Sequence, residues 1–114
     1  MSYLNYNHKV FYQIIYNPVN YDIITIASIS MISIDKCVLT MVHTNEKYRN
    51  LKFCQKNINL LIKNMFDNFK NIKKYILYVD KDNIYAIKCY EKCNFIIIEL
   101  KKDNKYLMEL NKIR

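Results

Sequence analysis

The chain has 114 residues and a mass of 13.9 kDa, which is enough for one domain with one hydrophobic core. Hydrophobic residues make up 52% of it, with 11 tyrosines and 5 phenylalanines, and this excludes disordered, collagen-like and coiled-coil classes. The net charge of +8 favours an anionic partner such as nucleic acid, a membrane surface or a phosphorylated cofactor. The sequence shows neither a signal peptide nor an apolar run of membrane-spanning length, so we expect a soluble, cytoplasmic protein that does not bind membranes.

The first part of the chain predicts three β-strands. Residues His8–Tyr16 and Tyr21–Ile32 are rich in β-branched and aromatic side chains. The segment Asn17–Asn20 between them contains Pro18 and two asparagines, which is typical of a turn, so the two strands are expected to form a hairpin. A third strand is predicted at Cys37–Thr44.

The hydrophobic pattern then changes to steps of three and four residues. The apolar positions that share one helical face are Cys54, Ile58, Leu61, Ile62, Met65, Phe66, Phe69 and Ile72. This spacing predicts an amphipathic helix that packs one face against a core.

Four further elements complete the chain. A short buried strand is predicted at Tyr75–Val79 and a second helix from Asn83 to about Lys92. The segments Phe95–Lys101 and Lys105–Asn111 are predicted to pair as a closing hairpin.

The predicted order is therefore β-β-β-α-β-α-β-β. The third strand, the first helix and the fourth strand form a β-α-β crossover, which implies parallel neighbours, whereas the hairpins imply antiparallel pairs. We expect a single α/β (α+β) domain over residues 1–114, with a mixed, mostly antiparallel sheet and helices on both of its faces.

The segment Leu77–Phe95 carries the most informative motif of the sequence. It resembles the strand–helix–strand signature of the GNAT superfamily of acetyl-CoA-dependent N-acetyltransferases. The matching residues are Leu77, Val79, Asn83, Ala86, Ile87, Tyr90, Glu91, Lys92 and Phe95. Asn94 replaces the usual glycine, and asparagine is the residue best able to take glycine's place at a left-handed helix end.

A second match lies between the third strand and the first helix. Tyr48 and Arg49 fit the start of the family's glycine-rich loop, but Asn50, Lys52 and Cys54 replace its glycines. Such a loop binds a pyrophosphate through successive backbone N–H groups and a helix N-terminus. The resemblance thus predicts a short, glycine-free variant of the family.

The resemblance implies that acetyl-CoA lies between the Cys37–Thr44 and Tyr75–Val79 strands, which separate from each other at that point. Pantetheine is expected along the third strand and the diphosphate at the loop. The implied cofactor-binding residues are Val42, His43, Thr44, Arg49, Asn50, Leu51, Lys52, Phe53, Cys54, Gln55, Asn83, Ala86 and Tyr90.

Two residues are candidates for catalysis. A tyrosine at the position of Tyr90 can protonate the departing CoA thiolate, and His43 is a candidate for the group that accepts the proton of the amine. No metal is expected, because Cys37, Cys54, Cys89 and Cys93 lack a zinc-binding spacing and are predicted to be reduced thiols.

The sequence leaves several alternatives open. The predicted activity is transfer of an acetyl group to a primary amine of a small molecule or protein, and the alternative is a GNAT-fold pseudoenzyme that binds CoA or a partner without catalysis. A nucleic-acid-binding role is disfavoured because no RNA-binding motif or arginine cluster is present. Most of the family's usual N-terminal β-α-α segment is not recognisable. The acceptor side is therefore open, or supplied by another chain, for example in a homodimer, or the protein has lost catalysis.

Overall fold

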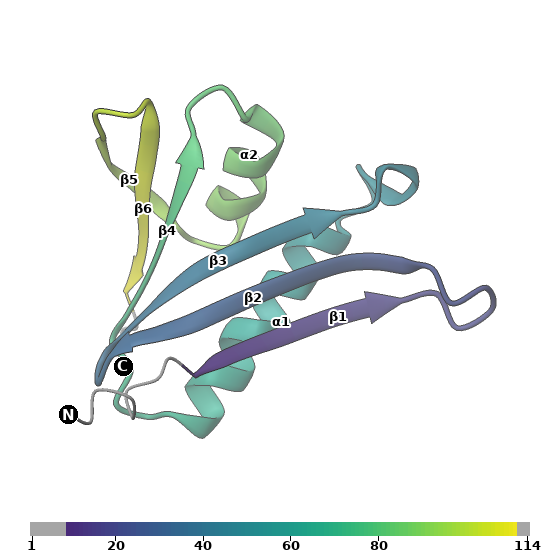
Figure 1. The fold of residues 1–114 in the computed structure, drawn as a ribbon, viewed down its shortest axis with the longest axis horizontal. Helices are drawn as coiled ribbons and strands as arrows, with labels where there is room; N and C mark the ends of the chain where they lie inside the picture. The colour runs from purple at the N-terminus through teal and green to yellow at the C-terminus, as the bar shows by residue number, and fades with distance from the viewer. Residues whose placement is uncertain (1–8, 112–114) are drawn as a thin grey trace.

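The computed structural model describes residues 9–111, and it contains one six-stranded sheet with two α-helices (Figure 1). The strand order is β1-β2-β3-β4-β6-β5. The elements are β1 (Val10–Tyr16), β2 (Ile23–Ser33), β3 (Lys36–Thr44), the 3-10 turn η2 (Glu46–Tyr48), α1 (Phe53–Asn68), β4 (Lys74–Asp80), α2 (Ile84–Lys92), β5 (Ile96–Leu100) and β6 (Lys105–Asn111). The predicted order and the mixed, mostly antiparallel sheet are confirmed; His8, predicted to begin the first strand, lies outside the described residues.

Helix α1 ends earlier than its apolar pattern predicts. The helix stops at Asn68, and Phe69 leaves it with φ −134° and ψ 85°. The ring of Phe69 packs against Phe11 of β1 with centroids 5.2 Å apart, and Ile72 is fully buried. The last two apolar positions of the pattern therefore fill the core from an irregular turn, and the expectation of a helix up to Ile72 is wrong.

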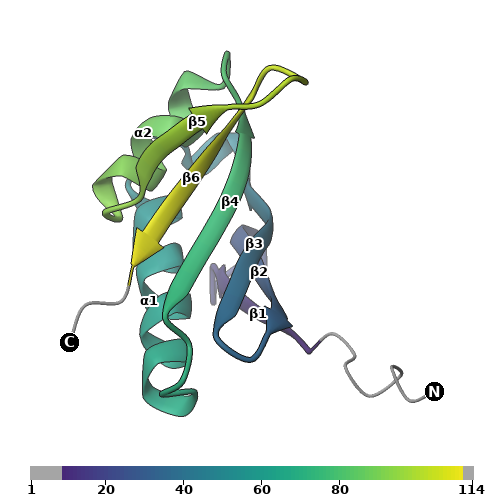
Figure 2. The same ribbon diagram turned by 90° about the vertical axis from the view of Figure 1, so that its left-hand side faces the viewer.

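Both helices lie on the same face of the sheet, so the prediction of helices on both faces is also wrong (Figure 2). β3 and β4 are parallel neighbours, and β4 and β5 are each antiparallel to β6, so β5 runs in the same direction as β4. The α1 and α2 connections thus both join parallel strands and both advance across the sheet in one direction. Because such crossovers are right-handed, their helices must cover one face.

The hydrophobic core fills the space between this face and the two helices. One cluster joins side chains of α1 and α2 with residues such as Ile29, Leu39 and Leu77 of the sheet. On the opposite face, within residues 9–111, no helix covers the sheet, and Tyr12 and Tyr78 are 60% and 50% exposed there. None of the described helices is long and apolar enough to cross a membrane.

The two central strands stay together for only part of their length. β3 pairs with β4 at three positions, the last of which joins Val38 to Ile76. Beyond that point β3 continues to Thr44 beside β2, and β4 continues to Asp80 beside β6 (Figure 1). Among residues 9–111, each strand therefore leaves one edge of backbone N–H and C=O groups without a strand partner, as the resemblance implies.

Candidate functional site

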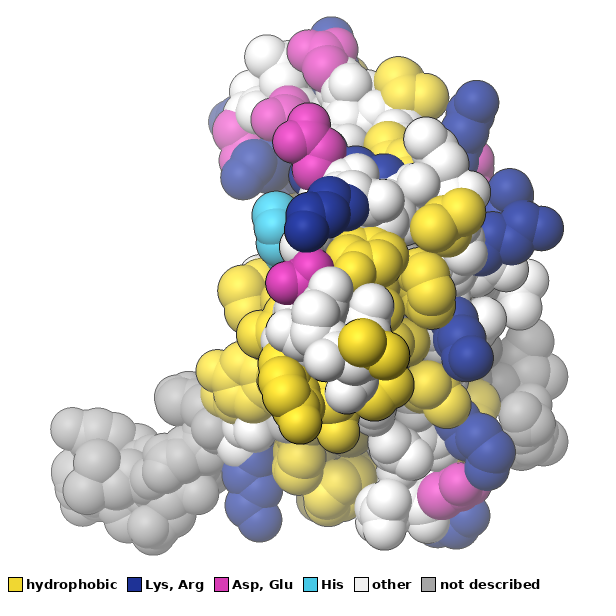
Figure 3. All heavy atoms as spheres, turned by 90° about the vertical axis from the view of Figure 1, so that its right-hand side faces the viewer, with side chains coloured by type: hydrophobic (Ala, Val, Ile, Leu, Met, Phe, Trp, Pro, Cys, Tyr) yellow, Lys and Arg dark blue, Asp and Glu magenta, His cyan; other side chains and the backbone are white. Residues whose placement is uncertain are grey.

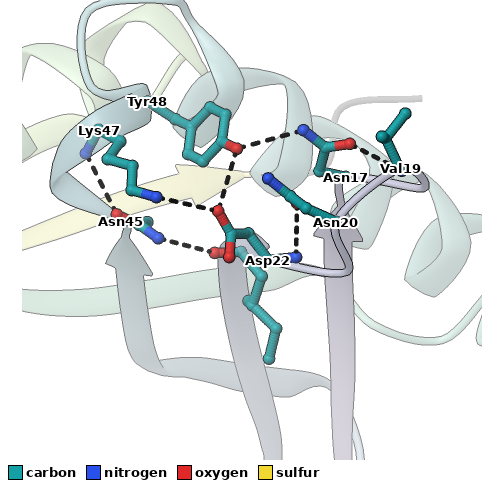
Figure 4. Close-up of polar contacts among 8 residues, drawn as sticks. Asn17, Val19, Asn20, Asp22, Asn45, Lys47 and Tyr48 are labelled. Carbon is teal, nitrogen blue, oxygen red and sulfur yellow. Dashed lines mark hydrogen bonds and ion pairs between the residues drawn. The ribbon is translucent and has the colours of Figure 1, made fainter.

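The segment that follows β3 is fixed to the tip of the β1–β2 hairpin (Figure 4). Lys47 Nζ lies 3.2 Å from Asp22 Oδ2, and the Tyr48 hydroxyl donates to the same carboxylate oxygen at 3.4 Å. Asn17 Nδ2 in turn donates to the Tyr48 hydroxyl oxygen at 3.2 Å. These contacts hold η2 in place, so the loop that begins at Arg49 leaves the sheet from an anchored point.

This loop contains left-handed backbone although it contains no glycine. Asn50 and Lys52 have φ of 70° and 67°, in the left-handed region, and both replace glycines of the family's loop. Asn94, at the end of α2, has φ of 73°. Asparagine tolerates this conformation, whereas a lysine is disfavoured there by about 1 kcal/mol or more. Two of the three positions where the family has glycine therefore have left-handed backbone, and at Lys52 this conformation is strained.

The loop leads directly into the N-terminus of α1. Lys52 is the N-cap residue and makes no side-chain capping hydrogen bond, and the first turn contains no acidic residue. Lys56 N donates to Lys52 O at 3.1 Å, so the N–H groups of Phe53, Cys54 and Gln55 precede the first intrahelical bond. Such an end has a positive partial charge and unpaired donors, which suit an anion.

Three adjoining cavities follow the gap between β3 and β4. The outer cavity, of about 300 Å³, contains Thr40, Met41, Tyr78 and Asp80 in its lining. The central cavity, of about 400 Å³, shares Val42, Asn83 and Tyr90 with the outer one. The basic cavity, of about 210 Å³, shares Asn50, Cys54 and Tyr85 with the central one. Together they make an elongated path from the bare face of the sheet to the loop.

Most of the predicted site residues line this path. Those in the central cavity are Val42, His43, Thr44, Arg49, Asn50, Cys54, Asn83, Ala86 and Tyr90. Lys52 and Gln55 line the basic cavity. Leu51 and Phe53 line none of the three: Leu51 is 59% exposed, and the ring of Phe53 lies edge-on to Tyr48 at 6.2 Å. For these two residues, only the backbone N–H groups remain as candidates for the contact that the resemblance implies.

The structure adds residues that the motif does not contain. Lys88 and Lys92 of α2 join Lys52 around the basic cavity, and Tyr85 lines both inner cavities. The signal for the two lysines is their four-residue spacing, which places them on one side of a helix. Asp80 lines the outer cavity together with Tyr90 and directly follows the matched Leu77 and Val79.

Burial shapes the chemistry of Tyr90. The side chain is 7% exposed, and removal from solvent raises the pKa of its hydroxyl above the ordinary value of 10.0. Nearby Cys54, Cys89 and Cys93 raise this pKa further. The phenol therefore keeps its proton at neutral pH and is available as a donor to both the outer and the central cavity.

Two hydrogen bonds fix the end of β3 beside the cleft. Arg49 Nε donates to Thr44 O at 3.2 Å, which ties the loop to the end of β3. The Thr25 hydroxyl donates to His43 O at 3.0 Å. His43 is the one histidine within residues 9–111, and its side chain is exposed at the end of the molecule shown in Figure 3. His43 also lines the central cavity.

Comparison with known proteins identifies the family. The sequence model of the acetyltransferase (GNAT) family matches residues 2–95, so the chain belongs to that family. A comparison with curated protein sequences gives no match.

Solved structures share the fold at low sequence identity. A domain from Methanocaldococcus jannaschii aligns with a TM-score of 0.78 and 14% identity, over 97% of this chain and 72% of that one. The N-acetyltransferase PseH of Campylobacter jejuni, in complex with acetyl coenzyme A, aligns with a TM-score of 0.74 and 22% identity, over 96% of this chain and 73% of that one. The PaiA N-acetyltransferase of Thermoplasma acidophilum, in complex with coenzyme A, aligns with a TM-score of 0.76 and 19% identity, over 90% of this chain and 61% of that one.

Proposed function

We propose that this chain binds acetyl-CoA along the three cavities and transfers the acetyl group to a primary amine. The observation that carries the proposal is the separation of β3 and β4 beyond Val38 and Ile76, which opens a path that ends at the uncapped N-terminus of α1. The family match and the complexes of similar structures with acetyl-CoA and CoA support the choice of ligand.

The residues along the path fit the parts of this cosubstrate. The free edge of β3 at Val42–Thr44 offers backbone groups for pantetheine, which can bind in the manner of an added strand. The N–H groups of Phe53–Gln55 would hold the diphosphate, and Lys52, Lys88 and Lys92 supply positive charge around the same cavity. When bound, acetyl-CoA supplies an acyl thioester that an amine can attack.

The outer half of the path provides groups for the acceptor. The amine would enter through the outer cavity, where the Asp80 carboxylate can attract a protonated amine and where no described helix covers the sheet. Asp80 or His43 would accept a proton from the amine, directly or through water. Tyr90 lies between the two ligand sites and would donate its hydroxyl hydrogen to the leaving sulfur.

Isothermal titration with acetyl-CoA tests the binding step. We expect saturable binding in the micromolar range, and absence of binding at millimolar acetyl-CoA would contradict the proposal. Catalysis is tested separately by thiol release in the presence of spermine, lysine-containing peptides and aminoglycosides. Binding without thiol release from any of these amines would instead support a CoA-binding protein without acetyltransferase activity.

A further inference from the structure

Two cysteines from different helices meet in the core beside the basic cavity. Cys54 lies in the first turn of α1 and Cys89 lies on α2, and their sulfur atoms are 2.7 Å apart. Both are free thiols, and their side chains are 4% and 7% exposed. An S–S bond is about 2.05 Å long, so these sulfurs need to approach by well under 1 Å to form one.

The pair is close to solvent although it is buried. Both cysteines line the basic cavity, and Cys54 also lines the central cavity. These cavities total several times the volume of a small oxidant such as hydrogen peroxide, so a molecule of that size fits in the space that Cys54 lines. Cys37, by comparison, is 0% exposed in the sheet and lines none of the three cavities of the cleft.

The two thiols have different acidities. The Cys89 S–H group donates to the Cys54 sulfur, and this hydrogen bond is the main reason that the pKa of Cys54 lies below its ordinary value. A hydrogen bond from the Thr44 hydroxyl lowers it further, and burial opposes both effects. The same interaction raises the pKa of Cys89. Cys54 is therefore the better nucleophile of the pair, since the thiolate is the reactive form.

We propose that Cys54 and Cys89 form a peroxide-reactive dithiol, in which Cys54 is oxidised first and Cys89 then closes an intramolecular disulfide. In the first step the Cys54 thiolate attacks one peroxide oxygen, the O–O bond breaks, and hydroxide leaves and takes a proton to become water. Cys54 is then a sulfenic acid. In the second step the Cys89 sulfur attacks the Cys54 sulfur, the S–O bond breaks, and hydroxide leaves with the Cys89 proton as water. The two thiols lose two electrons in total, and one peroxide is reduced to two waters.

The second step is favoured once the first has occurred. The pKa of Cys89 is raised chiefly by its hydrogen bond to the Cys54 sulfur. A sulfenic acid at residue 54 carries no thiolate charge to hold that proton, so Cys89 loses it more readily. The resulting bond would join the phosphate-binding end of α1 to the helix that carries Tyr90, closing a chain segment of about 35 residues.

The test is titration of the purified full chain with hydrogen peroxide, followed by intact-mass measurement and peptide mapping. We expect loss of two hydrogens per chain, a Cys54–Cys89 linkage, and restoration of the original mass by dithiothreitol. Because the linkage restricts the unfolded chain, we also expect the thermal midpoint to rise by about 10 °C. These readouts do not require the protein to bind acetyl-CoA, so failure here and failure of the proposed function are distinguishable.

Matched variants separate the two roles. Cys89→Ser should stop at the sulfenic acid of Cys54, which dimedone traps, and Cys54→Ser should abolish the two-hydrogen loss. Cys37→Ser is the control and should form the linkage as the natural chain does. The proposal is overturned if the natural chain keeps its mass under peroxide, or if the linkage maps to Cys89 and Cys93 or joins two chains. It is equally overturned if Cys54 stays unmodified in Cys89→Ser. If a variant does not fold, peptide mapping of the natural chain alone decides the test.

Discussion

Tyr90 has a packing role in the core and a proposed role as proton donor, and only the proposed role needs its hydroxyl group. Its ring lies 6.3 Å from that of Phe95 in an edge-on contact, while its side chain also lines the outer and central cavities. We expect Tyr90→Phe to keep this packing and the affinity for acetyl-CoA, but to lower the turnover number by about 100-fold, because it removes the donor to the leaving sulfur. Steady-state kinetics and isothermal titration measure the two quantities.

The pH dependence gives a second check on Tyr90. Because burial raises the pKa of its hydroxyl above 10.0, the donor keeps its proton as the pH rises through 10. We therefore expect the turnover numbers of the natural chain and of Tyr90→Phe to change in parallel near pH 10. An unchanged turnover number in the variant would remove Tyr90 from the proposed mechanism.

Asp80 is expected to act on the acceptor and not on the cosubstrate. Its carboxylate lines the outer cavity, on the bare face of the sheet. We expect Asp80→Asn to raise the KM for a cationic amine by about tenfold, since an attraction between charges is lost, and to leave the affinity for acetyl-CoA unchanged. Asp80→Glu is the matched control and should recover part of the effect. A KM that does not change in Asp80→Asn would contradict this role.

Lys52 allows the strain of the loop to be separated from its charge. Its φ of 67° is unfavourable for a lysine, and Lys52 lines the basic cavity. Lys52→Gly should stabilise the fold by about 0.5 kcal/mol, the relief of strain being partly offset by a more flexible unfolded chain. Lys52→Ala should bring no such gain. Both variants should bind acetyl-CoA about fivefold more weakly, because both remove the charge.

Urea denaturation and isothermal titration of the two Lys52 variants make the comparison. Equal stability of the glycine and alanine variants would show that the left-handed backbone costs nothing at this position. Unchanged affinity in both would exclude Lys52 as a phosphate-binding residue.

At the level of elements, α2 depends on a residue that also lines the cleft. The Asn83 side-chain oxygen accepts a hydrogen bond from Ala86 N at 3.2 Å and so caps the helix, while Asn83 lines the outer and central cavities. We expect Asn83→Ala to lower the free energy of unfolding by about 1 kcal/mol, and Asn83→Asp to preserve it, because aspartate caps helices equally well. Urea denaturation measures both.

Affinity for acetyl-CoA separates the two roles of Asn83. If Asn83→Asp keeps full stability but binds more weakly, the side chain contributes to the cleft independently of the cap. A loss of stability in Asn83→Asp equal to that in Asn83→Ala would show that the capping contact is not what holds the start of α2.

At the level of the whole molecule, buried thiols and phenols link stability to alkaline pH. Burial raises the pKa of Cys37 from 9.0 to about 11, and it also raises the pKa of Tyr75. The folded state therefore holds protons that the unfolded state loses above pH 9, so the stability is complete below pH 9 and falls as the pH rises towards 11. For Cys37 alone, the loss amounts to roughly 2–3 kcal/mol.

Urea denaturation at several values between pH 8 and pH 11 tests this linkage. The free energy of unfolding should decrease steadily over the range, and Cys37→Ala should show a shallower decrease from a lower starting stability. A profile that is flat between pH 9 and pH 11 would contradict the expected protonation of these buried groups.

The sequence by itself determined the secondary-structure elements and the family, because both depend on residues that lie close together along the chain. β-branched and aromatic runs, turn residues and a three-to-four-residue apolar pattern predicted the six strands and the two α-helices. The residues from Leu77 to Phe95 indicated the family that the sequence comparison then identified. The left-handed backbone of Asn94 was also predictable, since it depends on its place at a helix end.

Only the tertiary structure decided which residues meet. The placement of both helices on one face follows from strand order, and a local pattern does not contain strand order. Likewise, Lys52 and Lys88 share a cavity, and the Cys54 and Cys89 sulfurs lie 2.7 Å apart, because two crossovers of the same hand bring α1 and α2 together. Contacts between residues distant in sequence depend on how the chain closes on itself, and they become visible only when the fold is known.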